Sequence, residues 1–158
     1  MITKVRKRDG RIVLFDKDKI VSAVFKAMLS VNKPDKKEAE KLADLVEKDL
    51  EENFSKKETP SVEEIQDIIE KRLIKEGHAE TAKSYILYRY KRSLIREAKQ
   101  SLIGKIDDSD LSVSAVKIAE AKYLQKDENG NVIETPNEMF QRVAKCIAYV
   151  EKAYKKDE

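Results

Sequence analysis

The sequence has little cysteine, histidine, proline or glycine and no tryptophan: its 158 residues include one Cys, one His, three Pro and four Gly. A single Cys excludes an internal disulfide, and one Cys with one His excludes an ordinary zinc site built by this chain alone. No apolar run approaches the roughly 20 residues that a membrane-spanning helix needs, and the first residues lack the apolar stretch of a secretory signal. We therefore expect a cytoplasmic protein without a membrane partner.

Charged residues, in contrast, are abundant: they make up 40% of the chain, against 41% hydrophobic residues. With so few Pro and Gly, this composition is typical of a helix-rich protein with short loops. The length suits one domain of about 100 residues with a smaller appendage. The net charge is only +3, which does not favour a strongly basic nucleic-acid-binding protein.

The charge is unevenly distributed along the chain. Residues 1–33 hold nine Lys and Arg against three Asp, and residues 83–105 hold seven against one Glu. Residues 35–70, between them, hold six Lys against thirteen Asp and Glu. If the two basic segments meet in the fold, they form a local anion site on a nearly neutral protein; otherwise each is a solvated surface.

The basic N-terminal segment predicts a β-hairpin followed by a helix. Alternating residues flank Asp9-Gly10, a dipeptide typical of two-residue turns in which both central residues have positive φ. Asp16 or Asp18 can then cap a helix that begins near Lys19. Basic side chains beside the N–H groups of a helix N-terminus favour a polyphosphate ligand. On charge alone, however, a solvated hairpin is the stronger interpretation.

Four amphipathic helices are predicted after the hairpin. Asp35 and Ser61 are N-caps, Ser61 in a capping box with Glu64, and Gly77 ends the third helix. The fourth helix is expected from His78 to about Gln100. The apolar positions expected to face inward are Ile20, Val24, Ala27 and Met28; Ala39, Leu42, Ala43, Val46 and Leu50; Val62, Ile65, Ile68, Ile69 and Leu73; and Ala82, Tyr85, Ile86, Tyr90 and Leu94. The predicted fold is mainly α: a hairpin cap on a four-helix bundle.

A smaller helical extension is expected to follow. We predict one domain over residues 1–100, an acidic linker over 101–110 and a helical segment over 111–158. The last helix begins at Thr135, where a capping box precedes an apolar stripe. The stripe consists of Met139, Phe140, Val143, Ala144, Ile147 and Val150. Cys146 lies in the same helix and is interpreted as a small buried hydrophobe.

The chain opens with the string Val5-x-Lys7-Arg8-Asp9-Gly10, followed by Phe15-Asp16-x-x-Lys19-Ile20. This string resembles the start of the ATP-cone, the nucleotide-sensing domain at the N-terminus of many ribonucleotide reductases. Residues 61–67 resemble its third helix, and residues 82–92 the end of its fourth. The resemblance implies a β-hairpin over four helices that binds ATP or dATP, with or without Mg²⁺.

The resemblance also implies which residues contact the nucleotide. They are Val5, Lys7, Arg8, Asp9 and Gly10 in the hairpin; Asp16, Lys19 and Ile20 at the first helix; Val62 and Gln66 in the third helix; and Lys91 in the fourth. The basic members would bind phosphates, and the apolar ones would enclose the base. Val13 stands where many members of the family carry an acidic residue.

A further stretch connects the chain with a larger enzyme. Residues 134–144 resemble the start of the catalytic domain of ribonucleotide reductases, most closely the adenosylcobalamin-dependent class. The cysteines that perform the family's chemistry should lie downstream, and the single Cys146 cannot perform dithiol chemistry. We therefore expect a chain without catalytic activity of its own, either a piece of a larger protein or a natural truncation. Adenosylcobalamin is expected only for the complete enzyme.

The function expected from this resemblance is allosteric: binding of ATP or dATP controls a reductase through its conformation or oligomerisation. The expected partners are the remainder of the catalytic domain and further copies of the chain in the full enzyme. Two alternatives remain. A nucleic-acid-binding helical module would bind with a steep salt dependence, and a helical adaptor without a ligand would have a thermal stability that ATP does not change.

Overall fold

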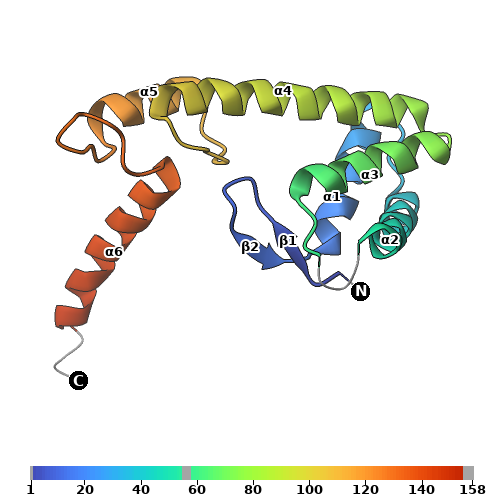
Figure 1. Cartoon of the computed structure of the whole chain (residues 1–158), viewed down its shortest axis with the longest axis horizontal. Coiled ribbons are helices and arrows are strands. Elements are labelled where there is room, and N and C mark those ends of the chain that lie inside the picture. Colours follow the sequence, from blue (N-terminus) through green and yellow to red (C-terminus); the bar gives the residue numbers. More distant parts are fainter. Residues whose placement is uncertain (1, 55–57, 155–158) are drawn as a thin grey trace. The chain divides into compact units, whose positions relative to one another are not determined.

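The computed structural model describes residues 2–54 and 58–154 and confirms a mainly α-helical fold with an N-terminal hairpin (Figure 1). The elements are β1 (Lys4–Arg6), β2 (Ile12–Leu14), α1 (Lys17–Ser30), α2 (Lys36–Asn53), α3 (Val62–Lys75), α4 (Ala79–Ile103), α5 (Val113–Lys122) and α6 (Pro136–Tyr154). The chain divides into two compact units, one ending at Lys91 and the other beginning at Arg92, so the division falls within α4. The predicted domain boundary at residue 100 stays a prediction.

The hairpin is closed by a longer loop than the sequence predicted. The Lys7 N–H donates to the Arg11 carbonyl at 2.8 Å, which makes residues 8–10 a three-residue loop. Within this loop Gly10 alone has a positive φ, +84°. The Asp9 carboxylate accepts the backbone N–H of Arg11 at 3.0 Å. The prediction of a two-residue turn was therefore wrong: Asp9 keeps an ordinary φ and only the glycine takes up the left-handed conformation.

The helix ends follow the predicted capping residues. Asp16, rather than Asp18, caps α1, and Asp35 caps α2. Ser61 and Glu64 form the capping box of α3. At the other end of α3, Gly77 has a φ of +82° and donates its N–H to the carbonyl two residues before the C-cap, which ends the helix.

The first unit is built around one hydrophobic core. The hairpin joins the helices because the Arg6 N–H donates to the Pro60 carbonyl at 2.9 Å, just before α3. The buried side chains are Ile2, Val5, Ile20, Val24, Ala27, Met28, Ala39, Leu42, Ala43, Val46, Leu50, Ile65, Ile69, Leu73, Ala82 and Tyr85. The apolar faces predicted for the first three helices are thus confirmed, except that Val62 and Ile68 are half-buried.

The inward face of α4 is narrower than predicted. Tyr85 is buried, but Ile86, Tyr90 and Leu94 are 39%, 63% and 47% exposed. At about 100° per residue, these three side chains lie roughly 100°, 140° and 180° around the helix from Tyr85. They were assigned to the core by residue type, although they lie off the helix face that carries Tyr85, and that assignment was wrong.

The second unit has a smaller core and a buried ion pair. Its buried apolar side chains are Ile103, Val116, Ala119, Leu124 and Met139. Lys99, which is 1% exposed, lies 3.1 Å from the equally buried Asp107 and donates to the Ser109 carbonyl at 2.6 Å. Residues 101–103 of the predicted linker continue α4, and this ion pair fastens part of the remaining segment to that helix.

The last helix, α6, is anchored at its start. Thr135 and Glu138 form hydrogen bonds typical of a capping box, and the buried Glu134 carboxylate accepts a hydrogen bond from Arg142 Nη2 at 2.7 Å. The contact with Arg142 lowers the pKa of Glu134. The exposed apolar side chains of α6 include Phe140, Val143, Ile147, Tyr149 and Val150. Cys146 is also exposed, so its interpretation as a buried hydrophobe was wrong: only the first turn of α6 reaches the small core.

No helix within the described ranges is both long enough and apolar enough to cross a membrane.

Candidate functional site

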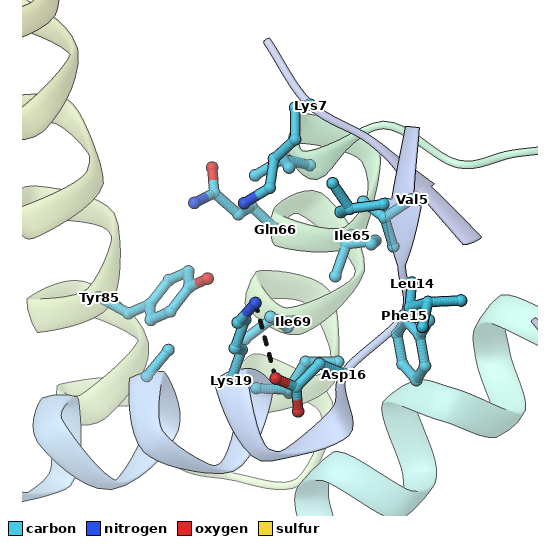
Figure 2. A pocket seen from close by; sticks show the side chains of 14 residues that line it. Val5, Lys7, Leu14, Phe15, Asp16, Lys19, Ile65, Gln66, Ile69 and Tyr85 are labelled. Carbon is cyan, nitrogen blue, oxygen red and sulfur yellow. Dashed lines mark ion pairs between the residues drawn. The ribbon is translucent and has the colours of Figure 1, made fainter. Parts of the chain in front are cut away.

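A cavity of about 160 Å³ lies in the first unit, where the hairpin, α1, α3 and α4 meet (Figure 2). It is lined by Val5, Lys7, Val13, Leu14, Phe15, Asp16, Lys19, Ile20, Ala23, Val62, Ile65, Gln66, Ile69 and Tyr85. Most of these side chains are apolar, and a few polar groups converge among them. This combination is typical of a small-molecule site, in which apolar contact gives affinity and the polar groups fix orientation.

The polar groups of the cavity come from four different elements. Lys7 follows β1, Lys19 lies in the first turn of α1, Gln66 lies on α3 and Tyr85 on α4. Figure 2 shows the ends of these four side chains pointing into the same space. Two ammonium groups against one lining carboxylate, Asp16, make this space suitable for an anion.

The N-terminus of α1 is closed by the protein itself. The Asp16 carboxylate accepts the Asp18 N–H at 3.1 Å, and its other oxygen lies 3.6 Å from Lys19 Nζ. The sequence predicted that backbone N–H groups of this helix would face an anion, and Asp16, as the N-cap, takes up one of these groups. The full positive charges in the cavity lining are those of Lys7 and Lys19.

The apolar wall is formed by the hairpin and α3. Val5 and Val13 face each other across the two strands, and Phe15 continues the same side of the second strand. Ile65, near the start of α3, adds a buried side chain to this wall and is 8% exposed. The wall can accept a flat apolar ring, such as that of a nucleobase.

Tyr85 closes the cavity from the side of α4. Burial is the main cause that raises the pKa of its hydroxyl to about 12. The nearby carboxylates of Glu70 and Asp67 also raise this pKa, whereas the guanidinium groups of Arg89 and Arg8 lower it. The phenol is therefore neutral at physiological pH and can donate a hydrogen bond.

Three of the residues predicted in the hairpin lie beside the cavity lining rather than in it. Arg8 Nε pairs with Glu63 at 2.6 Å, and its Nη2 donates to Gln66 Oε1 at 3.4 Å. Asp9 pairs with Arg11, which lowers the pKa of the Asp9 carboxyl. Gly10 provides the left-handed turn of the loop. Arg8 is thus the member of this group that is linked to a lining residue.

Lys91 also lies outside the lining. It is exposed and lies six residues after Tyr85, which places it about 120° around α4 from the face that meets the cavity. Arg89 shares the face of Tyr85, but it pairs with Asp67 at 2.5 Å and Glu70 at 2.8 Å on α3. In the described part of the chain no basic residue of 83–105 lines the cavity, so the second basic segment adds no cation there.

The structure therefore places seven of the eleven predicted residues in the lining and adds others that the sequence did not indicate. The seven are Val5, Lys7, Asp16, Lys19, Ile20, Val62 and Gln66. The added residues are Val13, Leu14, Phe15, Ala23, Ile65, Ile69 and Tyr85. Strand alternation could have indicated Val13, which pairs with Val5, and Phe15, which lies two residues later on the same face. No sequence signal gives the direction of the Tyr85 hydroxyl.

No group of three or more His, Cys, Asp or Glu residues that could hold a metal ion occurs within residues 2–54 and 58–154. The cavity itself offers the single carboxylate of Asp16.

Comparison with protein families gives two matches that together cover most of the chain. Residues 3–94 match the ATP cone domain, and residues 109–158 match the all-alpha domain of ribonucleotide reductase. The chain is 52% identical to a vitamin B12-dependent ribonucleoside-diphosphate reductase of Thermoplasma acidophilum, over 98% of this chain and 20% of the relative. It is 37% identical to a protein of that name from Mycobacterium tuberculosis strain CDC 1551, over 96% of this chain and 21% of the relative.

A more distant relative is the anaerobic ribonucleoside-triphosphate reductase of Haemophilus influenzae, 31% identical over 65% of this chain and 14% of the relative. The chain spans about a fifth of the length of the two vitamin B12-dependent relatives. The first family match covers the hairpin, the cavity and the helices around it. The chain therefore belongs to the ATP-cone family, and residues 109–158 match the all-alpha domain of ribonucleotide reductase.

Proposed function

We propose that the cavity binds ATP or dATP and that this chain is the allosteric region of a ribonucleotide reductase. The observation that supports the proposal is the convergence of Lys7 and Lys19 in a mostly apolar cavity within an ATP cone domain. Reduction of ribonucleotides is proposed for the complete enzyme, by analogy with the names of its relatives. Adenosylcobalamin belongs to that complete enzyme, and we assign no residue of this chain to it.

The proposed roles divide the cavity into two parts. Lys7 and Lys19 bind the phosphates through charge-assisted hydrogen bonds, which are stronger than neutral ones. The base lies against the apolar side chains of Val5, Ile20 and Val62, and the Gln66 amide bonds to the edge of the base. Mg²⁺ prefers oxygen ligands and is commonly held by substrate phosphates with one or two carboxylates. If it accompanies the nucleotide, Asp16 is the lining carboxylate that fits this role.

Regulation follows from differential binding of the two nucleotides. ATP and dATP differ by one hydroxyl group, so a response to their ratio requires that each stabilise a different conformation or assembly of the reductase. The remainder of the catalytic chain and further copies of the enzyme are the proposed partners. The exposed apolar stripe of α6, within the all-alpha match, is the surface that we propose for the contact with the catalytic part.

Isothermal titration of the 158-residue chain with ATP and dATP tests the proposal. We expect saturable binding of both nucleotides. Lys7→Ala should weaken it by about tenfold or more, because it removes a charged hydrogen-bond donor from the cavity. Lys91→Ala is the matched control: it removes the same charge outside the lining, and we expect a change within about twofold.

Two results would contradict the proposal. If neither nucleotide gives heat or raises the melting temperature, the chain is an adaptor without a ligand. If a single-stranded oligonucleotide binds with a steep salt dependence while ATP does not compete, the chain is a nucleic-acid-binding module. A loss of binding in Lys91→Ala equal to that in Lys7→Ala would instead place the phosphates toward the exposed side of α4.

A further inference from the structure

The hydroxyl of Tyr85 is a donor at the end of a buried ring, and it points into the cavity. The residue is 6% exposed, and its ring belongs to the core of the first unit. Figure 2 shows the oxygen at the end of the ring nearest Lys19 and Gln66. Among the residues that the structure describes, none forms a hydrogen bond with this hydroxyl. A donor that faces the cavity without a protein partner is free to bond to a ligand that supplies an acceptor.

The surroundings of the hydroxyl indicate the charge of that acceptor. The ammonium groups of Lys7 and Lys19 point into the same space, and the phenol between them is neutral and carries a proton to donate. An anionic oxygen in this space would accept hydrogen bonds from both cations and from the phenol. The apolar residues Leu14 and Phe15 lie on the opposite side of the cavity from Tyr85 (Figure 2). The tyrosine thus belongs to the polar part of the site.

We propose that Tyr85 donates its O–H to a phosphate oxygen of the bound nucleotide, together with Lys7 and Lys19. This inference rests on the proposed function and names a further binding residue for it. Tyr85 would be the contribution of α4 to phosphate binding, in place of Lys91, which lies outside the cavity lining.

The test is the titration of the full chain carrying Tyr85→Phe with ATP and with dATP. The substitution removes one oxygen and keeps the ring in the core. We expect the affinities for both nucleotides to fall by about tenfold and by the same factor, because a hydrogen bond to a charged acceptor is lost and the phosphates are common to both ligands. Tyr88→Phe removes the same atom from a side chain that is 65% exposed and outside the cavity lining, and should leave both affinities unchanged.

A second measurement separates ligand binding from a structural role. Without nucleotide, Tyr85→Phe should melt at the same temperature as the unmodified chain or higher, because no protein hydrogen bond is lost. With saturating ATP, the increase in its melting temperature should be smaller than that of the unmodified chain. A lower melting temperature without nucleotide, combined with unchanged affinities, would assign the hydroxyl a structural role and overturn the inference.

Three further outcomes would also overturn it. Unchanged affinities in Tyr85→Phe, while the unmodified chain binds ATP, would show that the hydroxyl makes no contact, and the proposed function would survive. A loss for ATP alone would show that the hydroxyl contacts the ribose rather than a phosphate. If the unmodified chain binds neither nucleotide, the proposed function itself fails, and the inference fails with it.

Discussion

At the scale of single residues, Arg8 is held beside the cavity by an acidic residue of α3. Its Nε lies 2.6 Å from Glu63 Oε1, and the arginine side chain is 19% exposed. If Arg8 binds a phosphate, as the family resemblance implies, the phosphate must compete with the Glu63 carboxylate. Glu63→Gln should therefore tighten ATP binding by about two- to fivefold, the range expected for a partly exposed ion pair. Isothermal titration at fixed ionic strength measures this change.

The control for this prediction is Asp67→Asn. Asp67 lies on the same helix and pairs with Arg89, so the substitution removes the same charge without releasing Arg8. Equal tightening in both variants would show that the effect is the general loss of negative charge from α3. Tightening in Glu63→Gln alone would show that the ion pair itself opposes binding.

The site residues show how far sequence can predict a cavity. Lys7 and Lys19 were named by resemblance, and they do line the cavity, because the hairpin and the start of α1 are local structures in which the sequence spacing fixes where side chains lie. Tyr85 was assigned to the core, and its ring does lie there, but the direction of its hydroxyl depends on elements distant in sequence. Lys91 was named by resemblance, and its position around α4 follows only once the helix is packed. Nucleotide contact by any of these residues stays a prediction.

At the scale of elements, the segment after α4 depends on the buried ion pair of Lys99 and Asp107. Both side chains are 1% exposed, and Asp107 also accepts hydrogen bonds from the backbone and side chain of Ser109. Removing one member leaves the other charged and buried without its partner. Asp107→Asn should therefore lower the free energy of unfolding of the second unit by about 3–5 kcal/mol. Urea denaturation followed by circular dichroism measures the change.

Asp110→Asn provides the comparison for Asp107→Asn. Asp110 lies in the same segment and contacts Arg92 at 3.4 Å, but its side chain is 99% exposed, so the loss should be within about 0.5 kcal/mol. If Asp107→Asn costs no more than Asp110→Asn, the buried pair does not hold this segment to α4, and the segment behaves as the linker that the sequence predicted.

The helix boundaries were more predictable than the buried faces. Asp35 and Ser61 mark helix starts because an N-cap acts on N–H groups two or three residues away, a purely local interaction. Ile86 and Phe140, in contrast, are apolar residues whose exposure depends on what packs against α4 and α6. Amphipathic periodicity indicates which residues share a face, but the partner of that face is set by tertiary structure.

At the scale of the whole molecule, the chain combines two units with separate cores, and the cavity belongs to the first. A ligand stabilises only what it binds. ATP at about 100 times its dissociation constant should raise the free energy of unfolding of the first unit by about 2.7 kcal/mol. The second unit, with its smaller core, should be unchanged unless nucleotide binding is coupled to it.

Hydrogen exchange measured by mass spectrometry on the full chain tests this separation. With ATP, the slowest-exchanging amides of α2 and α3 should exchange up to about a hundredfold more slowly, because they open with the first unit. Amides of α5 and α6 should keep their rates, and Lys7→Ala should reduce the protection of α2 and α3 to about tenfold or less at the same ATP concentration. Slower exchange in α5 would contradict this expectation. It would show that nucleotide binding in the first unit is coupled to the second unit within this chain, without the catalytic part of the enzyme.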